Sequence, residues 1–179
     1  PDAGTTPFRS EKNTNWEGAF RVPALVRWPG KIPAGSICNE IVSHLDWMPT
    51  LLAIAGDPDG KEKLRKGYKV GKKTFKVHLD GYNLLPLFEG QTKKSERLEF
   101  FYFNDDGDLV AMRFDNWKIV FAEQRHEGFA VWQEPFVQLR LPKIFNLRSD
   151  PFEKGDRIGI GYDKWRIDRT FLLVPAQEY

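Results

Sequence analysis

The chain has 179 residues, 41% of them hydrophobic and 14% aromatic, so it can bury a sizeable core as one large domain or two small ones. A formal net charge of +2 gives no reason to expect nucleic acid or an anionic membrane as a partner. Cys38 is the single cysteine, which excludes an intrachain disulfide, and no stretch approaches the roughly twenty apolar residues of a membrane span.

The N-terminal region contains the first pattern that suggests chemistry. Residues 1–10 are polar and contain Gly and Pro, which predicts a loop. Val22–Trp28 is a run of branched and aromatic residues closed by Pro29-Gly30, and this pattern predicts a strand that is covered on both faces. Lys12 lies in the loop before that strand, which places its ammonium to contact an anion at the strand end.

A helix is expected to cover this strand. Asp46 is the predicted N-cap, and Pro49 fits the first turn because its missing N–H would have no helical partner there. Gly56 is the predicted C′ glycine that ends the helix. The expected apolar stripe consists of Leu51, Leu52, Ile54 and Ala55.

The composition then becomes polar and basic. Residues 57–76 are rich in Lys, Gly and Asp, which indicates an exposed excursion. The basic run Lys61–Lys76 is interpreted as a solvated face in preference to a patch that binds an anionic ligand. Apolar packing returns at Asp80–Gly90, and the polar segment Gln91–Arg97 is the expected domain boundary.

The remainder of the chain has the pattern of a sheet. Three strands are expected, at Glu99–Phe103, Asp108–Phe114 and Trp117–Glu123. Asp106-Gly107 and Asp115-Asn116 are turn signals between them, so the strands are expected to form an antiparallel meander. A fourth strand is expected at Ile144–Leu147, and the spacing of apolar residues in Tyr162–Leu173 suggests a short final helix.

Four segments carry motifs that resemble one known family. Lys12–Gly30 contains a lysine, an acidic residue, paired small residues and an Arg-Val-Pro strand entry, in that order. Ser43–Gly56 looks like the helix that follows, Asp80–Gly90 is similar to a D-G-x-x-L-x-P-x-L segment, and Ile144–Glu153 to an L-Y-[DN]-L-x-x-D-P-x-E segment. The chain therefore resembles the sulfatases over nearly its whole length, and it is most like their arylsulfatase branch.

The resemblance implies an α/β fold class, with this chain as the C-terminal part of an alkaline-phosphatase-like sulfatase fold. Residues 1–95 would be the end of the large α/β domain, and residues 96–179 a small C-terminal subdomain with an antiparallel sheet and a helix. The implied function is that of a sulfuric ester hydrolase, which in its intact form hydrolyses aryl or carbohydrate sulfate monoesters.

The resemblance also assigns one catalytic residue. Lys12 matches the family's lysine that contacts the sulfate oxygens and favours the charge that develops on the leaving group. Glu17 and Arg21 flank the same loop and are expected to pair and to support the turn that aims Lys12. Gly18 is expected to allow a close backbone approach or a positive φ, whereas Ala19 stands where the family commonly has glycine, which is a departure from the family's pattern in this turn.

The cofactors that the family implies are expected outside this chain. Its formylglycine nucleophile is made from a cysteine or serine in a C-x-P-x-R context, and Cys38 is followed by Asn39-Glu40 instead. The family's calcium ligands also lie N-terminal to the Lys12 segment. We therefore expect no metal or cofactor site on this chain, and we expect the isolated chain to be inactive.

Other polar clusters have simpler interpretations. His44 and Asp46 would not share a helix face, and His78 and His126 have no partner at metal-ligand spacing. Asn104–Asp108 looks like a calcium loop, but with Gly107 at the sixth position the twelfth is Arg113, so a hairpin turn is expected.

Two alternative functions stay open at this stage. The chain could be a non-catalytic module for packing and substrate recognition, or a part of a phosphodiesterase or phosphonate hydrolase of the same superfamily. The expected partners are the N-terminal remainder of the sulfatase and a sulfate ester, with neither nucleic acid nor membrane. A periplasmic or secreted location is implied by the family alone.

Overall fold

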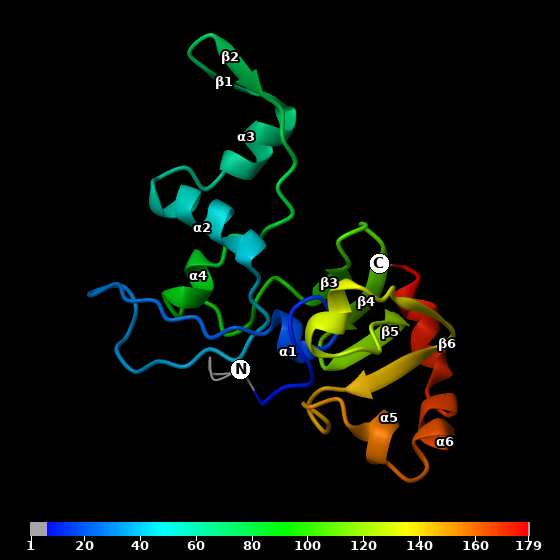
Figure 1. Ribbon diagram of the computed structural model, residues 1–179. Coiled ribbons are helices and arrows are strands. Elements are labelled where there is room, and N and C mark those ends of the chain that lie inside the picture. The colour runs from blue at the N-terminus through cyan, green and yellow to red at the C-terminus, as the bar shows by residue number, and fades with distance from the viewer. Residues whose placement is uncertain (1–6, 179) are drawn as a thin grey trace. The chain divides into compact units, whose positions relative to one another are not determined.

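The computed structural model describes residues 7–178 of the chain (Figure 1). The chain forms two compact units by its internal contacts. One unit joins Pro1–Ala24 to Glu99–Tyr179, and the other comprises Leu25–Leu98. The predicted division into domains of residues 1–95 and 96–179 stays a prediction.

The first unit is built on a four-stranded antiparallel sheet. Its strands are β3 (Glu99–Phe103), β4 (Leu109–Phe114), β5 (Trp117–Glu123) and β6 (Val137–Asn146), in the order β3-β4-β5-β6. The predicted meander is confirmed, and the predicted fourth strand is confirmed but begins earlier. Gly107 and Asp115 both have positive φ in the hairpin turns, as turns between antiparallel strands commonly require.

The core of this unit lies between the sheet and the N-terminal segment. Trp16 is buried, and its ring meets Phe145 of β6 edge-on at 5.9 Å between centroids. Phe20 of the short helix α1 (Glu17–Phe20) packs edge-on against Tyr102 of β3 at 4.7 Å. Such edge-to-face contacts add to the free energy of apolar burial, so they fix α1 on the sheet.

The C-terminal region forms several short helices where one was expected. They are α5 (Gly155–Ile158), α6 (Tyr162–Ile167), η3 (Thr170–Leu172) and α7 (Leu173–Ala176). Arg169 leaves helical geometry with ψ near 12°, which separates α6 from η3. The Tyr162 hydroxyl donates to the carbonyl of Ile144 at 3.0 Å and accepts from its N–H at 3.2 Å, which ties α6 to β6.

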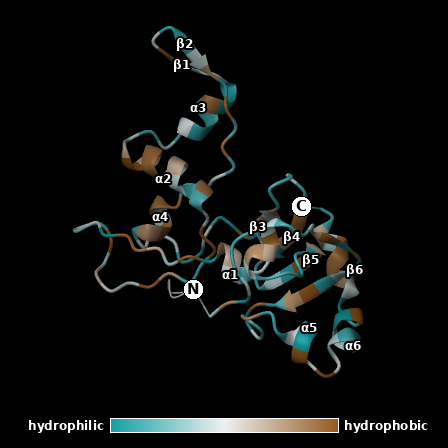
Figure 2. Ribbon diagram, viewed as in Figure 1, coloured by the Kyte–Doolittle hydropathy of each residue, from teal (hydrophilic) through white to brown (hydrophobic). Residues whose placement is uncertain are grey.

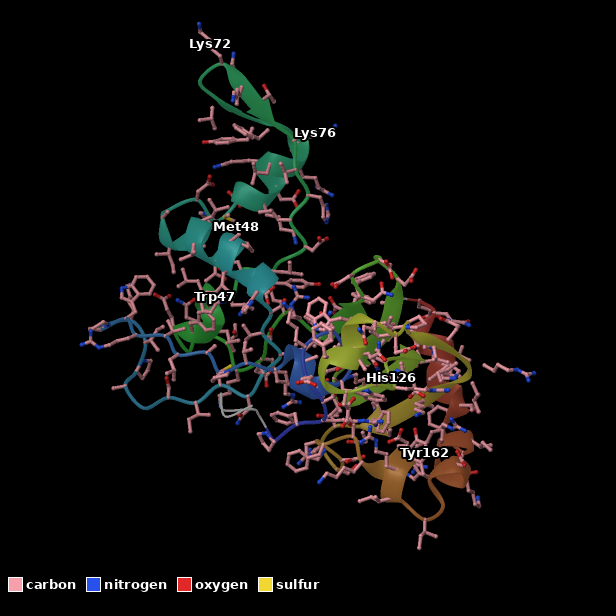
Figure 3. All side chains as sticks on the ribbon, in the orientation of Figure 1. Trp47, Met48, Lys72, Lys76, His126 and Tyr162 are labelled. Carbon is pink, nitrogen blue, oxygen red and sulfur yellow. The ribbon has the colours of Figure 1, made fainter. Side chains whose placement is uncertain are left out.

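The second unit is mostly helical. It contains η1 (His44–Asp46), α2 (Trp47–Ile54), α3 (Gly60–Lys66), the hairpin strands β1 (Tyr68–Val70) and β2 (Lys73–Phe75), and α4 (Leu85–Phe88). All residues of β1 and β2 are exposed, and Figure 3 shows Lys72 at the tip of this hairpin and Lys76 at its base. The predicted exposed excursion is therefore confirmed.

Asp46 stands at the N-cap position of α2, as predicted, but its side chain makes no capping hydrogen bond to that helix. It belongs instead to the capping box of η1, in which the Ser43 side chain accepts from the backbone N–H of Leu45 and Asp46 occupies the third position. The buried Asp46 carboxylate accepts from the backbone N–H groups of Ser43 and Tyr82 and forms an ion pair with Arg97 at 2.7 Å. These contacts explain the difference, because they direct the carboxylate into the unit instead of along α2.

The end of α2 is as predicted, but its buried face is not. Gly56 has a φ of 91°, and the N–H of Asp57 reaches the carbonyl of Leu52 at 2.9 Å, as in a Schellman motif. Pro49 and Thr50 are the buried residues of α2, whereas Leu51 and Ile54 of the predicted apolar stripe are exposed. Figure 2 shows that the helix is hydrophobic over most of its length, so its sequence does not single out one face.

The predicted strand at Val22–Trp28 is wrong. These residues form no hydrogen-bonded ladder with any described segment, and Leu25 is 99% exposed. A strand exists only through pairing with neighbouring strands, and the described residues supply no partner for this one. The segment therefore leaves several apolar side chains open to solvent, including Val22 and Val26.

Candidate functional site

The predicted catalytic residue Lys12 lies on an exposed turn of the first unit. Asn13 follows it with a φ of 68°, a conformation that asparagine tolerates better than most residues. The Lys12 side chain is exposed, and its Nζ lies 5.3 Å from the centroid of the Trp132 ring. The cation is thus held near an aromatic face and remains accessible to an anion.

The loop behind Lys12 is fixed to the sheet by buried hydrogen bonds. Asn15 is fully buried, and its Oδ1 accepts from the backbone N–H of Gln124 at 3.0 Å. The Trp16 indole N–H donates to the carbonyl of Gln124 at 3.3 Å. These bonds join two segments that are more than a hundred residues apart in the sequence.

A buried charge cluster lies under the same loop, and it consists of Glu17, Tyr102, Lys118 and Glu153. Lys118 is fully buried, and its ammonium donates to the carbonyl of Asn15 at 2.7 Å and to Glu17 Oε1 at 3.0 Å. It also forms an ion pair with Glu153 Oε1 at 2.8 Å. The Tyr102 hydroxyl donates to Glu17 Oε1 at 2.6 Å. The backbone N–H of Glu17 donates to Glu153 Oε2 at 2.7 Å, which closes the network.

The two carboxylates of the cluster differ in their electrostatics. Burial alone would raise the pKa of Glu17, but the Lys118 charge and the hydrogen bonds from Tyr102 and Arg21 lower it to about 2. Burial raises the pKa of Glu153, and the nearby charge of Glu17 adds to this rise. Burial and the charge of Glu17 also raise the pKa of Tyr102, which keeps the phenol protonated as a donor.

The residues that flank Lys12 behave largely as the sequence predicted. The expected pair of Glu17 and Arg21 is confirmed, with Arg21 Nε 2.6 Å from Glu17 Oε2. The expected close approach at Gly18 is also confirmed, because a β-carbon there would overlap the carbonyl oxygens of Arg9 and Ser10. Ala19 lies in α1 without a positive φ, so the alanine fits where the resemblance expected glycine.

Sequence reasoning missed several residues that build this site. Glu153 ends the family-like segment Ile144–Glu153, but the segment alone does not indicate that its carboxylate is buried in an ion pair. Lys118 interrupts the apolar run of β5, and a lone cation in a strand that is otherwise buried could have indicated an ion pair. Gln124 and Tyr102 carried no signal, since their contacts are made with residues far away in the sequence.

A short aromatic segment, η2 (Gly128–Trp132), lies next to the Lys12 loop and is drawn in yellow in Figure 1. The backbone N–H of Gly128 donates to Glu11 Oε1 at 2.6 Å, which ties η2 to the residue before Lys12. Val131 points inward and is buried, whereas Phe129 and Trp132 are 77% and 57% exposed. The surface around Lys12 is therefore both cationic and aromatic.

The other polar clusters do not assemble into a second site among residues 7–178. His44 and His126, the latter labelled in Figure 3, are exposed, and His78 faces Asp80 at 3.2 Å on the surface. The predicted turn at Asn104–Asp108 is confirmed, with Asn104 Oδ1 accepting from the backbone N–H of Asp108 at 2.7 Å. Within the described residues, no group of three or more His, Cys, Asp or Glu side chains is placed to hold a metal ion.

The helices of the described residues are all too short or too polar to cross a membrane. The exposed Cys38 is not paired with another cysteine.

Comparison with known proteins gives the family context for this geometry. Residues 1–57, which include Lys12, match the model of the Sulfatase family. Mouse steryl-sulfatase is 32% identical over 126 residues, which are 70% of this chain and 16% of that protein. Human arylsulfatase A is 32% identical over 163 residues, which are 85% of this chain and 29% of that protein.

A solved structure extends the likeness to the whole chain. The crystal structure of the PsFucS1 sulfatase from Pseudoalteromonas sp. matches 99% of this chain and 33% of its own, with 25% identity and a TM-score of 0.71. The predicted fold class is thereby confirmed: an α/β, C-terminal part of a sulfatase fold with a small antiparallel-sheet and helix subdomain. The chain spans less than a third of the curated relatives named above, and it belongs to the sulfatase family.

Proposed function

We propose that the full-length protein hydrolyses sulfate monoesters and that Lys12 is a catalytic residue of this reaction. The observation that carries the proposal is the position of Lys12: an accessible ammonium on a loop fixed from beneath by buried hydrogen bonds and charges, inside the segment that matches the Sulfatase family. A preorganised cation of this kind stabilises developing charge because it needs no reorganisation during the reaction.

Lys12 is proposed to act on the leaving group. When the bond between sulfur and the ester oxygen breaks, negative charge develops on that oxygen as it leaves as an alcohol or phenol. The Lys12 ammonium stabilises this charge and the sulfate oxygens. Glu17 and Lys118 do not touch the substrate in this scheme. They hold the loop through Asn15 and α1 and so keep Lys12 in place.

The nucleophile and metal are proposed to come from other parts of the full-length protein. The family resemblance implies a formylglycine and calcium, but Cys38 is exposed without the C-x-P-x-R context. The described residues contain no group of side chains that fits a calcium site. No step on this chain is therefore assigned to either group, and the partner of this chain is the remainder of the sulfatase.

The substrate is proposed to be an aryl or carbohydrate sulfate. Relatives are named steryl-sulfatase, arylsulfatase A and, in the dog, N-acetylgalactosamine-6-sulfatase. These names agree on a sulfate ester and differ in the alcohol, so they support the reaction class more than one substrate. They do not favour a phosphodiesterase, a phosphonate hydrolase or a non-catalytic module. A periplasmic or secreted location belongs to the same proposal.

The test compares Lys12→Ala with Lys72→Ala in the full-length protein. Loss of one preorganised donor is expected to lower kcat/KM for 4-nitrophenyl sulfate by about two to three decades. Lys72 lies on the exposed β1–β2 hairpin, so its substitution should leave the rate unchanged. The isolated 179-residue chain serves as a blank and should show no turnover. Equal rates for wild type and Lys12→Ala would show that Lys12 is an ordinary surface residue.

A further inference from the structure

Two large aromatic side chains next to Lys12 are left open to solvent. Phe129 is 77% exposed and Trp132 is 57% exposed, although η2 as a whole is anchored to the unit. They lie three residues apart in a 3₁₀ helix, where side chains at this spacing fall on the same face. Together they form an exposed aromatic surface, and adjacent aromatic groups of this kind commonly mark a binding site.

The backbone that carries this aromatic surface is held in place. Gln124 is buried, and its side-chain amide donates to the carbonyl of Glu134 at 2.7 Å, just beyond η2. The same amide approaches the carbonyl of Val131 at 3.4 Å. Gln124 also makes the backbone bonds to Asn15 and Trp16, so one residue fixes η2 and the Lys12 loop relative to each other.

The distance between the Lys12 ammonium and the Trp132 ring suits a sulfate ester that carries a ring. Lys12 Nζ lies 5.3 Å from the Trp132 ring centroid, so a single small ester can reach both groups. A ring-bearing sulfate ester has an anionic end for the ammonium and a flat apolar ring for stacking. A free inorganic anion would use only the first of these features.

We infer that Trp132, with Phe129 beside it, binds the ring of the leaving group and so determines which sulfate esters the protein accepts. This inference rests on the proposed function, since it requires Lys12 to face the scissile ester. The ring of the substrate is a phenol ring or a pyranose ring, because an indole can stack on the flat face of the first and on the apolar C–H face of the second. Trp132 is a specificity-determining residue in this scheme and takes no part in bond cleavage.

The experiment measures selectivity in the full-length protein. The variants are Trp132→Ala, Trp132→Phe and Phe129→Ala, with Phe171→Ala as a control for loss of an exposed phenylalanine elsewhere on the same unit. Each is assayed with 4-nitrophenyl sulfate, with glucose 6-sulfate, and for competitive inhibition by inorganic sulfate, which has no ring. Thermal unfolding of each variant checks that the fold is retained.

Trp132→Ala is expected to lower kcat/KM for a ring ester by about five- to tenfold, the size of a lost stacking contact. Trp132→Phe should recover most of this loss, and Phe129→Ala should show a smaller loss. The inhibition constant of inorganic sulfate should change less than twofold in all variants, and Phe171→Ala should match wild type. The ester with the larger loss identifies the preferred ring as aryl or pyranose.

Two results would overturn the inference while leaving the proposed function intact. The first is an active wild type whose kcat/KM for both ring esters is unchanged in Trp132→Ala. The second is a Trp132→Ala variant that loses ester turnover and sulfate inhibition equally or unfolds at a lower temperature, because the ring then packs against the protein itself. A wild type that hydrolyses neither ester would overturn the proposed function, and this inference with it.

Discussion

The two units of the chain differ in the largest feature that each contains, a buried charge cluster in one and an exposed apolar helix face in the other. The unit that contains the sheet encloses charge: Glu17, Lys118 and Glu153 are all at most 1% exposed. The unit of residues 25–98 leaves apolar surface open: Met48 and Leu51 of α2 are each more than half exposed. Both units pair their buried charges internally, as the ion pair of Asp46 and Arg97 shows for the helical unit. The helical unit differs because α2 keeps large apolar side chains in contact with solvent, where they gain nothing from burial.

The two units therefore depend on different contacts for their stability. In the sheet unit the contacts of the buried Lys118 ammonium with its three oxygen partners must all be present, because an unpaired buried charge would be very unfavourable. An exposed apolar helix face contributes little to the free energy of unfolding, but it favours association with another surface. We therefore expect the sheet unit to fail when one residue of the charge cluster is removed, and the helical unit to respond mainly in its association.

The largest effect is expected for Lys118→Met. Methionine fills similar space but removes the buried cation that both carboxylates share, so that Glu153 loses its ion pair and Glu17 keeps only its ion pairs with arginine. Breaking a buried pair in this way should lower the free energy of unfolding by about 3–5 kcal/mol. Urea unfolding of the 179-residue chain, followed by near-ultraviolet circular dichroism, measures the loss.

Lys164→Met is the matched control for this variant. Lys164 forms an ion pair with Asp168 at 2.8 Å, but both side chains are largely exposed. Exposed pairs contribute about 0–1 kcal/mol, so this variant should unfold close to wild type. If the two variants lost the same stability, the cluster would not be the support of the sheet unit.

A second, smaller effect concerns acid stability through Glu17. Its folded pKa of about 2 lies below the ordinary value of 4.5, so its contribution is present above pH 4.5 and is lost as the pH falls towards 2. A pKa shift of this size corresponds to about 3 kcal/mol in the free energy of unfolding. Glu153, whose pKa is raised, has the opposite sign: its contribution is complete below pH 4.5 and is lost as the pH rises through the folded pKa.

Glu17→Gln should therefore be less stable than wild type at neutral pH and should lose less stability between pH 4.5 and 2. Urea midpoints across this range measure the slope. Glu62→Gln is the control, because Glu62 forms an exposed pair with Arg65 and should follow the wild-type curve. A Glu17→Gln curve parallel to wild type throughout the acid range would contradict the assignment.

The smallest effect on stability is expected in the helical unit. Met48→Gln together with Leu51→Gln removes apolar groups from an exposed face of α2, so the free energy of unfolding should change by less than about 0.5 kcal/mol. Self-association of the isolated chain should decrease, as measured by sedimentation velocity at high concentration. If the isolated wild-type chain stayed monomeric, the exposed face of α2 would not drive self-association, and this prediction would be wrong.

The success of prediction followed how local the determining contacts are. The meander at β3–β5 was predictable, because side-chain alternation and the turns near Gly107 and Asp115 are encoded within a few residues. The strand at Val22–Trp28 and the apolar stripe of α2 were not, since their burial depends on surfaces that neighbours must supply. An apolar run shows that a segment prefers burial but does not show what covers it.

The candidate site shows the same limit. Lys12 was found only through a family motif, because a loop lysine has no distinguishing pattern of its own. The pair of Glu17 and Arg21 was predictable from proximity in the sequence. The contacts of Lys118 with Glu17 and of Gln124 with Asn15 span 101 and 109 residues, so no local pattern could have identified the partner residues.

The hydroxyl of Tyr162 has a consequence for how the sheet meets other molecules. β6 is an outer strand, and an outer strand offers free N–H and carbonyl groups on which a foreign strand can assemble. Tyr162 occupies both groups of Ile144 with a single phenol oxygen, near the C-terminal end of β6. A side chain from α6 thus blocks the pairing of a foreign strand at this position of β6, although no further strand covers the edge.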